Sequence, residues 1–397
     1  MQIPSAQRLF AQVQALAAVA SILDDVEALG ADVYLVGGAV RDLILGRRLL
    51  DIDLAIDGEP LRLATALGDP EGAQTRFGTL SVIRGGVRYD LVRTRSERYP
   101  HPGALPEVAP AGIEADLARR DFTVNALALG LGGSRTGELI AANGALSDLE
   151  QRQLAVLHDG SFSDDPTRLL RLARYCARLG FEPAPHTREL ADAAIAGDAL
   201  ATLSGTRLGN ELRLLATEPD SIAAFEAVAA LGMPWALDPD ATRRALDVLP
   251  DDGRADRLVL ASVFGTLHQP QLNSELDRLG FTATDRDAIA EGATQASDLA
   301  RRLAKTTSRS EIARTVGTAG IETVALAFSR GSPSQSLTWL HDLRHLKLDI
   351  TGEDLIDNSI PEGPVIGEAL ARARDALYNG TAPDRDSQLK VALSAAR

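Results

Sequence analysis

Apolar residues recur at helical spacing through the first thirty residues of the chain. This spacing predicts one amphipathic helix, with Ser5 as its N-cap and Gly30 at its end. Beyond Gly30 the spacing of the apolar residues changes. Between residues 33 and 140 the apolar residues form short runs that stop at glycines or alternate with polar residues. That pattern is typical of β-strands, so we expect the strands to lie mainly in this part of the chain.

The strand-like runs are separated by clear turn signals. Apolar residues precede Gly37, polar and apolar residues alternate before residue 57, and the pair Gly85-Gly86 divides two further runs as in a hairpin. We predict strands over 33–36, 49–56, 80–83, 88–92 and 124–129. Residues 96–114 are rich in proline, glycine and charge, which predicts a mobile loop.

From Asp164 onward the pattern is helical almost to the end of the chain. A helix over 167–179 is predicted to stop at Gly180, and glycine or proline separates the later helical stretches. The sequence therefore predicts an α+β protein, with a small α/β part followed by a long all-α part.

Composition narrows the class of protein. The chain has 397 residues, 45% hydrophobic and 24% charged, which is long enough for roughly two or three domains and excludes a fully disordered chain. The single cysteine, Cys176, excludes an intrachain disulfide and a cysteine-rich zinc module, and it fits a reducing, cytoplasmic location. No run approaches about 18 apolar residues, so no membrane span is expected. The net charge of −14 argues against generic nucleic-acid binding.

The first group of candidate chemical residues follows the strand 33–36. Gly37 and Gly38 lie between this strand and a predicted helix, where backbone N–H groups can approach an anion. Arg41, one turn into the helix, is placed to add a charge-assisted contact to phosphate. The run predicts a phosphate-binding turn, although a glycine pair after a strand is also consistent with a tight turn alone.

Three aspartates form a candidate metal site. Asp51 and Asp53 lie two residues apart on a predicted strand, so both carboxylates face the same side, and Asp90 on the strand 88–92 is a candidate third ligand. Carboxylates at this spacing suit Mg²⁺, which often keeps phosphate oxygens in its shell. Two such ions can activate an attacking hydroxyl and stabilise a leaving pyrophosphate. An isolated D-x-D pair is common in loops, so only its context supports a metal site.

The competing class of function is a dinucleotide-binding oxidoreductase. Its fingerprint G-x-G-x-x-G needs a third glycine, but no glycine occurs among the four residues that follow Gly38. It also leaves the paired aspartates without a role.

A second group of polar residues spans 119–126 with the sequence R-R-D-F-T-V-N-A. Arg120 is a candidate ligand for a triphosphate, Asp121 for ribose hydroxyls, and Asn125 can both donate and accept hydrogen bonds. A solvated charge cluster ahead of a core segment is the alternative, and without further context it is the preferred one.

A third group lies in the run D-D-P-T-R-L-L-R-L-A-R over 164–174. Asp165 and Arg168 are three residues apart, so on a helix they share a face. A carboxylate accepts from an exocyclic amine and a guanidinium donates to ring nitrogen or carbonyl oxygen, so the pair is complementary to cytosine and adenine. Arg171 and Arg174 complete the candidate nucleotide-binding set. Alternatively, Asp165 is an N-cap before Pro166 and the arginines are solvated.

In this order and spacing the three runs resemble the class II tRNA nucleotidyltransferase and poly(A) polymerase family of the polymerase β superfamily. G-G-A-V-R-D with D-I-D is similar to motif A of the family, R-R-D-F-T-V-N-A to motif B, and D-D-P-T-R to the base-selecting stretch E-D-x-x-R. The match covers residues 33–215. The chain departs from the family pattern at Asp164, which replaces the usual Glu, and at residues 142–145, where many members have D-P-x-G-G.

The resemblance implies a fold, an activity and site residues. The fold is a small mixed-sheet nucleotidyltransferase head (1–145), an all-α neck that recognises the nucleobase (146–217), and a helical body and tail that bind tRNA (218–397). The activity is template-independent transfer of CMP and AMP from CTP and ATP to the 3′ end of tRNA, with Mg²⁺. The residues that match the family positions are Asp51 and Asp53 for metal, Gly37, Gly38 and Arg41 for triphosphate, Arg120, Asp121 and Asn125 near the sugar, and Asp165 and Arg168 for the base.

Four activities share these motifs: complete CCA addition, CC addition, addition of the final A, and polyadenylation. Bacterial poly(A) polymerases of the family tend to be basic, whereas this chain has three lysines, which favours a tRNA enzyme. Residues 96–118 are of full length where the family has a flexible loop needed for the final A, which favours CCA or A addition. The sequence gives no oligomeric state.

The resemblance also changes the meaning of the acidic composition. Arginines concentrate over 84–98 and 168–178, whereas much of the acid lies elsewhere, as in 238–256. We therefore expect an arginine-lined cleft on an acidic body and salt-sensitive binding of tRNA.

Overall fold

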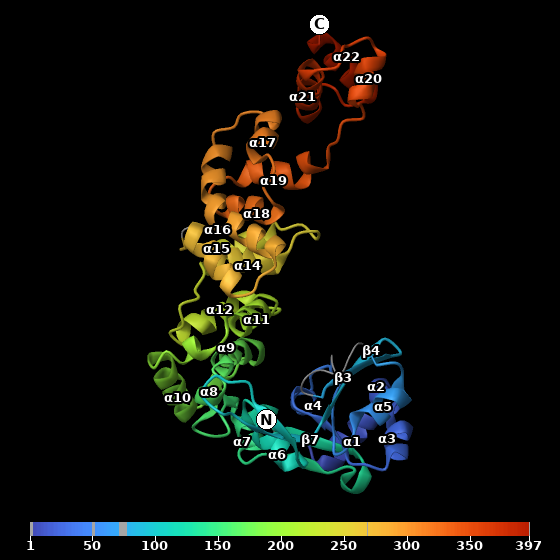
Figure 1. Cartoon of the computed structure of the whole chain (residues 1–397), viewed down its shortest axis with the longest axis vertical. Coiled ribbons are helices and arrows are strands. Elements are labelled where there is room, and N and C mark those ends of the chain that lie inside the picture. Colours follow the sequence, from blue (N-terminus) through green and yellow to red (C-terminus); the bar gives the residue numbers. More distant parts are fainter. Residues whose placement is uncertain (1–2, 50–51, 71–77, 268, 397) are drawn as a thin grey trace. The chain divides into compact units, whose positions relative to one another are not determined.

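A computed structural model describes residues 3–49, 52–70, 78–267 and 269–396 of the chain (Figure 1). It contains two compact units, Met1–Ser204 and Gly205–Arg397. The first unit combines a sheet with helices, and the described part of the second is helical, so the predicted α+β class is confirmed. The boundary between the units lies inside the segment predicted to be the neck. The division into head, neck, and body with tail stays a prediction.

The N-terminal segment forms three short helices, not the single helix that its apolar spacing predicts. They are α1 (Ala6–Gln14), α2 (Ala17–Ala20) and α3 (Leu23–Leu29). The backbone leaves the helical conformation at Leu16, where ψ is 119°. Because of this break, each of the three helices can direct a buried valine into the core. Ser5 caps α1 by accepting a hydrogen bond from Arg8 N, and Gly30 ends α3 with a φ of 68°.

Six strands of the first unit form one mixed sheet. In chain order they are β1 (Val33–Val36), β2 (Ile52–Ile56), β3 (Leu80–Arg84), β4 (Val87–Arg93), β7 (Leu127–Gly132) and β8 (Leu139–Ala141). Their spatial order is β3-β4-β2-β1-β7-β8, in which β2 and β4 run parallel and the other neighbours antiparallel. The strands predicted over 33–36, 80–83 and 88–92 are confirmed. The strand predicted over 49–56 is confirmed from Ile52 onward, whereas residues 50 and 51 lie outside the described residues. Strand β7 starts later than predicted because the 3₁₀ turn η1 (Thr123–Asn125) precedes it.

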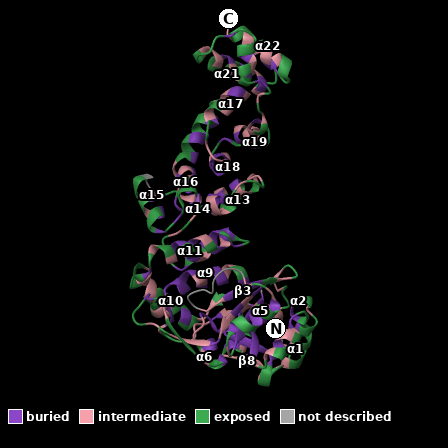
Figure 2. Ribbon diagram, turned by 45° about the vertical axis from the view of Figure 1, so that its right-hand side comes forward, coloured by how far each residue is buried: buried purple, intermediate pink, exposed green. Residues whose placement is uncertain are grey.

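Helices cover the sheet and exclude water from its strands. From α6 (Ile113–Ala118), Ile113 and Leu117 pack in an apolar cluster with residues of β1, β2 and β7. Helix α5 (Pro60–Leu67) packs against β3 and α3, and α4 (Gly38–Ile44) follows β1 directly. The central strands β1, β2 and β7 are accordingly almost entirely buried. Buried residues gather in the interior of this unit (Figure 2). Burial of this apolar surface at about 25 cal/mol per Å² holds the strand ends, and thus the polar residues on them, in place.

Residues 95–110 form a two-stranded hairpin in place of the mobile loop that their composition predicts. Strand β5 (Arg95–Arg98) pairs antiparallel with β6 (Glu107–Pro110), and an ion pair joins Arg98 to Glu107 across the strands. Near the tip, Gly103 N donates to the carbonyl of Ser163 at 3.2 Å. Polar contacts at both ends hold this hairpin, and apolar periodicity does not reveal them.

The rest of the first unit is mainly helical. It consists of α7 (Ala145–Gln151), β9 (Gln153–Leu154), α8 (Ser161–Asp164), α9 (Thr167–Leu179), β10 (Glu182–Pro183), α10 (Pro185–Ala196) and η3 (Ala199–Thr202). The helix predicted over 167–179 is confirmed as α9, and Gly180 ends it in the left-handed conformation with a φ of 67°. A glycine accepts this φ without the steric cost of a Cβ.

The second unit is built from helices, several of which begin at a polar cap or a proline. They are α11 (Gly205–Ala216), α12 (Ser221–Ala230), α13 (Pro239–Asp247), α14 (Ala255–Val263), α15 (Gln269–Arg278), α16 (Ala283–Leu303), α17 (Arg309–Val316), α18 (Ile321–Ser329), α19 (Pro333–His341), α20 (Gly352–Asp357), α21 (Pro364–Tyr378) and α22 (Arg385–Ala395). Among the described residues, none of the helices combines the length and the apolar character that crossing a bilayer requires.

Candidate active site

Two of the three predicted metal carboxylates are neighbours in the sheet. Asp53 on β2 and Asp90 on β4 are partners in the parallel register, so their side chains leave the sheet on the same face. Ser81 Oγ and Arg88 Nε both donate to Asp90 Oδ1, the second at 3.1 Å, which orients the Asp90 carboxylate. The third, Asp51, lies outside the described residues.

The donor set suits a hard cation. Among the residues that the structure describes, which do not include Asp51, no group of three or more His, Cys, Asp or Glu side chains is arranged around one point. Asp53 and Asp90 nevertheless supply two carboxylates side by side, which are the oxygen ligands that Mg²⁺ prefers.

The glycine turn after β1 brings an arginine into close contact with the backbone. Gly37 has a φ of 67° and a ψ of −128°, and a Cβ placed on it would lie 2.5 Å from Arg120 Nη1. Only glycine fits here without moving the guanidinium group. Arg41 from α4 is 3% exposed, and its guanidinium donates to Asn125 Oδ1 and, at 2.9 Å, to Asp42 Oδ1. The structure therefore brings Gly37, Arg41, Arg120 and Asn125 together.

Asp121 and Asn125 are buried, so the alternative of a solvated charge cluster is wrong for both. Asp121 accepts hydrogen bonds from Asn125 Nδ2 at 3.0 Å, from Phe122 N at 2.9 Å and from Arg171 Nε at 2.9 Å. Burial alone would raise the pKa of Asp121, but Arg171 and the hydrogen bonds outweigh it and hold that pKa at about 2. The carboxylate is therefore ionised at any physiological pH.

Tyr175 lies at the centre of three of the predicted arginines, and the sequence analysis missed it. The guanidinium carbons of Arg41, Arg171 and Arg174 lie 5.6, 5.8 and 5.8 Å from the centre of its ring. Cations at such distances are attracted to an aromatic face. Phe122 meets the same ring edge-on, with centroids 5.8 Å apart. The sequence gives no sign that Tyr175 contacts these arginines, because a single tyrosine at helical spacing is equally typical of a core position.

The candidate base-reading residues are both held, but not on a common helix. Asp165 is in an extended conformation before α9, and its Oδ1 accepts from Thr167 N at 3.0 Å, so the expectation of a shared helical face is wrong. Arg168 is 4% exposed and donates to Ser161 Oγ at 2.6 Å and to the carbonyl of Arg119 at 2.8 Å. The alternative of a solvated arginine is therefore wrong for Arg168.

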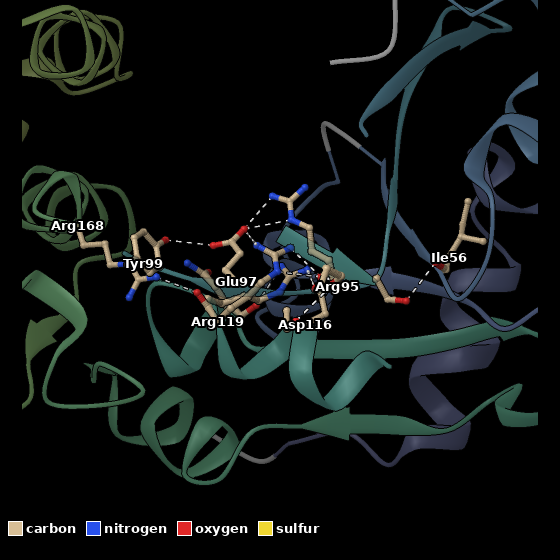
Figure 3. Close-up of polar contacts among 12 residues, drawn as sticks. Ile56, Arg95, Glu97, Tyr99, Asp116, Arg119 and Arg168 are labelled. Carbon is tan, nitrogen blue, oxygen red and sulfur yellow. Dashed lines mark hydrogen bonds and ion pairs between the residues drawn. The ribbon is translucent and has the colours of Figure 1, made fainter. Parts of the chain in front are cut away.

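The hairpin adds side chains that the sequence analysis did not assign to the site. Glu97 accepts from Tyr99 Oη at 3.1 Å, from Arg119 Nη1 at 2.9 Å and from Arg95 Nη2 at 2.9 Å (Figure 3). Burial, and then the nearby Glu97, raise the pKa of Tyr99 to about 12, and the charges of Asp165 and Arg168 also act on it. Tyr99 is therefore a neutral hydroxyl near the base-reading pair. No local sequence signal marks these residues, because their partners are far along the chain.

Comparisons with known proteins define the class. Residues 33–155 match the model of the poly A polymerase head domain. Over 393 residues, 91% of the chain, the sequence is 32% identical to an A-adding tRNA nucleotidyltransferase of Geobacter sulfurreducens, of which it covers 45%. Over 364 residues, 90% of the chain, it is 34% identical to a CC-adding tRNA nucleotidyltransferase of Deinococcus radiodurans, of which it covers 87%. The chain thus spans about half the length of the first relative.

Two solved structures of CCA-adding enzymes are similar to this chain over nearly its whole length. The apo form II of a CCA-adding enzyme is similar with a TM-score of 0.81 and 28% identity, covering 99% of this chain and 100% of the other. The Thermotoga maritima CCA-adding enzyme complexed with tRNA_CCA is similar with a TM-score of 0.75 and 26% identity, covering 100% of both chains.

The fold and the head-domain match define a nucleotidyltransferase. More narrowly, the chain belongs to the family of class II tRNA nucleotidyltransferases. Nucleotidyltransferases of this family generally use divalent metal ions.

Proposed function

We propose that the protein adds C and A nucleotides to the 3′ end of tRNA from CTP and ATP, without a template, and releases pyrophosphate. The observation that carries the proposal is the register of Asp53 with Asp90, in the same unit as the buried polar cluster of Arg41, Asp121 and Asn125. The relatives that add A, CC or CCA to tRNA support the same chemistry.

We assign the metal to the carboxylates of motif A and its neighbour. Asp51, Asp53 and Asp90 would hold Mg²⁺, since two of them lie in register on parallel strands. Bound by these carboxylates, two Mg²⁺ ions would supply positive charge for activation of the 3′ hydroxyl and for stabilisation of the leaving pyrophosphate. The contacts of Ser81 and Arg88 orient Asp90 before the metal arrives.

The triphosphate and the sugar of the nucleotide would be bound by a prearranged set of side chains. The N–H of Gly37 donates to the Leu127 carbonyl at 2.9 Å, so Gly37 would let the phosphates approach the turn, and Gly38 would offer its backbone N–H group. Arg41 and Arg120 lie beside this turn. Asp121 and Asn125 would contact the ribose. Hydrogen bonds already connect Arg41 to Asn125 and Asn125 to Asp121, so little reorganisation is needed on binding.

The nucleobase would be selected by Asp165, which precedes α9, and by Arg168 on α9, with Arg171 and Arg174 further along that helix. A carboxylate and a guanidinium are complementary to the Watson–Crick edges of cytosine and adenine. Arg168 is immobilised by Ser161 and the Arg119 carbonyl, which supports selection by a rigid group. A mispaired polar group in a buried site costs on the order of 1–3 kcal/mol.

The wider architecture follows the same assignment. We assign catalysis to the head (1–145), base recognition to the neck (146–217) and tRNA binding to the body and tail (218–397). The single thiol of Cys176 fits a protein that acts in the cytoplasm, where thiols stay reduced.

Addition of the final A alone is the second candidate function. The A-adding relative from Geobacter sulfurreducens favours it. The hairpin β5–β6 supports both A addition and complete CCA addition over CC addition, because it occupies the position of the loop that the family needs for the final A. Polyadenylation is less favoured, since the chain is acidic and poor in lysine.

Product lengths on defined tRNAs distinguish these activities. The protein is incubated with tRNAs that end before, within and after CC, with CTP, ATP or both. Complete CCA addition predicts growth by three nucleotides on the shortest tRNA when both nucleotides are present. Growth only on tRNA ending in CC would assign A addition, and growth that stops after CC would assign CC addition. No growth on any of the tRNAs would contradict the proposal.

A further inference from the structure

A buried carboxylate of α6 has no role in the site described so far. Asp116 is 0% exposed, and its Oδ2 accepts from Arg120 Nη2 at 3.0 Å. Its Oδ1 accepts from Arg119 Nε at 3.0 Å and Nη2 at 2.7 Å, and from the backbone N–H of Arg95 at 3.3 Å. Two consecutive arginines of motif B therefore share one carboxylate.

This carboxylate remains ionised despite its burial. An unpaired buried charge costs several kcal/mol, and close counter-charges with good hydrogen bonds offset that cost. Burial alone would raise the pKa of Asp116, but Arg120 and Arg119 outweigh it and hold the pKa below its ordinary value. Asp116 thus binds both guanidinium groups throughout the neutral range.

The position of Arg120 depends on this contact. Its Nη1 would lie only 2.5 Å from a Cβ placed on Gly37, and it donates to the carbonyl of Asn125 at 3.4 Å. An arginine side chain has many rotamers, and ordering it in one of them costs conformational entropy. The charge-assisted hydrogen bond that Arg120 donates to Asp116 selects the one rotamer that lays the guanidinium over the glycine turn.

We propose that Asp116 is a positioning residue that holds Arg120 against the Gly37 turn and so prepares the binding site of the triphosphate. The inference rests on the proposed function, because that function places the phosphates of CTP and ATP at this turn. Both nucleotides carry the same triphosphate, so Asp116 serves them equally.

Glu97 supports the same arrangement from the hairpin without contacting Arg120. It binds Arg119 on the side away from Asp116 (Figure 3). Arg168, in contrast, is held by the backbone carbonyl of Arg119 and by Ser161, and not by either carboxylate. Asp116 therefore contacts Arg120 directly but reaches Arg168 only through the backbone of Arg119, so we expect its main effect to fall on the triphosphate.

The test is the variant Asp116→Asn, which keeps the shape of the side chain and removes its charge. We expect the KM values for CTP and for ATP to rise by the same factor, at least about tenfold, because a charge-assisted hydrogen bond to Arg120 is lost. Inhibition by inorganic pyrophosphate is expected to weaken by a similar factor. The KM for tRNA and the kcat at saturating nucleotide are expected to change less than about threefold. A purely structural role would not select the phosphates in this way.

Asp32→Asn is the matched control. Asp32 also accepts several hydrogen bonds, from Ser134 N and Oγ, but it lies at the opposite end of β1 from Gly37. Its variant is expected to leave all of these constants unchanged. In the Arg120→Gln background, adding Asp116→Asn is expected to raise KM by less than about twofold, because the two residues act through one contact.

Three results would overturn the inference: unchanged KM values and pyrophosphate inhibition in Asp116→Asn, an effect on only one of the two nucleotides, or fully additive effects in the double variant.

If Asp116→Asn does not fold, Asp116→Glu is the variant to test, since it keeps the charge and displaces it by one methylene. An unchanged KM in Asp116→Glu contradicts the inference. If the unsubstituted protein adds nothing to tRNA, the proposed function fails. Calorimetric binding of pyrophosphate to the same variants then still tests the position of Arg120.

Discussion

At the scale of single residues, the site is a set of charges that are held in place before any ligand binds. Asp121 is surrounded by Arg171, Asn125 and a backbone N–H, and Asp90 by Ser81 and Arg88. Fixed dipoles and charges of this kind stabilise developing charge without reorganising during the reaction. Substitutions that remove one charge and keep the shape are therefore the most informative.

Replacement of Asp53 tests the metal assignment. Asp53→Asn is expected to reduce nucleotide addition at least about a hundredfold, because a carboxylate ligand of the metal is worth several kcal/mol in the transition state. Binding of tRNA, measured by filter retention, should persist. Asp57→Asn, just beyond the end of the same strand, is the control and should retain activity. Full turnover by Asp53→Asn would contradict the assignment.

The ion pair between Asp121 and Arg171 has a definite pH dependence. The pKa of Asp121 is about 2 in the folded protein and lower than in the unfolded chain, so its contribution is complete above the unfolded pKa. It is lost as the pH falls from about 4 towards 2 and amounts to about 2 kcal/mol. Urea unfolding should therefore show a constant difference between the unsubstituted protein and Asp121→Asn from pH 5 to 9. A difference that changes within that range would contradict this pKa.

At the scale of elements, the hairpin β5–β6 is attached at both ends within the first unit. Its base is hydrogen-bonded to Asp116, and Gly103 near its tip donates to Ser163 ahead of α9. A Cβ on Gly103 would lie 2.2 Å from Thr202 Oγ1. The hairpin therefore connects the head of the predicted architecture to its neck.

A substitution at the hairpin tip tests this connection. Gly103→Ala combines a positive φ of 70° with the clash at Thr202, and it should displace the tip. We expect addition of the final A to fall at least about tenfold relative to addition of C, by product length on tRNAs ending before and after CC. Gly30→Ala is the matched control, with a φ of 68° and nothing within 4 Å of the added carbon. Equal effects of the two variants would show that backbone strain alone is responsible.

The elements also show how far the sequence could be interpreted. The helix α9 was predicted to the residue, because its apolar period and Gly180 are both local signals. The three N-terminal helices were not, because no glycine or proline marks the break at Leu16. The hairpin was missed because β5 is polar and β6 is fully exposed, so neither strand shows a buried apolar face. Its position depends instead on Arg98, Glu107 and the distant Asp116.

The roles of the candidate site residues stay a prediction, whereas the contacts among them could not be predicted from the sequence. The motif carboxylates and arginines were found from spacing, and the structure brings Asp53 to Asp90 and Arg41 to Asn125. The prediction that Asp165 and Arg168 share a helix was wrong, since Asp165 lies just outside α9. Tyr175 and Asp116 act through partners that local pattern cannot specify.

At the scale of the whole molecule, an acidic chain with a net charge of −14 is proposed to bind an acidic polymer. Binding then depends on local arginines, and each neutralised phosphate releases counterions. Salt should therefore weaken the complex strongly, whereas weak attraction elsewhere limits binding to unrelated RNA.

Titration with salt tests this balance. The logarithm of the tRNA association constant is expected to fall linearly with the logarithm of the KCl concentration, with a slope on the order of −3. Between roughly 50 and 200 mM KCl the affinity should fall about 60-fold. An unrelated RNA hairpin of equal length, as control, should bind at least about tenfold more weakly throughout. An affinity that is independent of salt would contradict the expectation.

The strand order of the head has a consequence for biosynthesis. Strand β1 pairs on one side with β7, which begins at Leu127, far along the chain from Val33. During translation at about 5–20 residues per second, β1 and β2 wait several seconds before β7 leaves the ribosome. An apolar strand edge is exposed for that time, and unpaired edges are prone to aggregate. A ribosome-associated chaperone would therefore be most useful during this period. The period ends only when β7 emerges and pairs with β1.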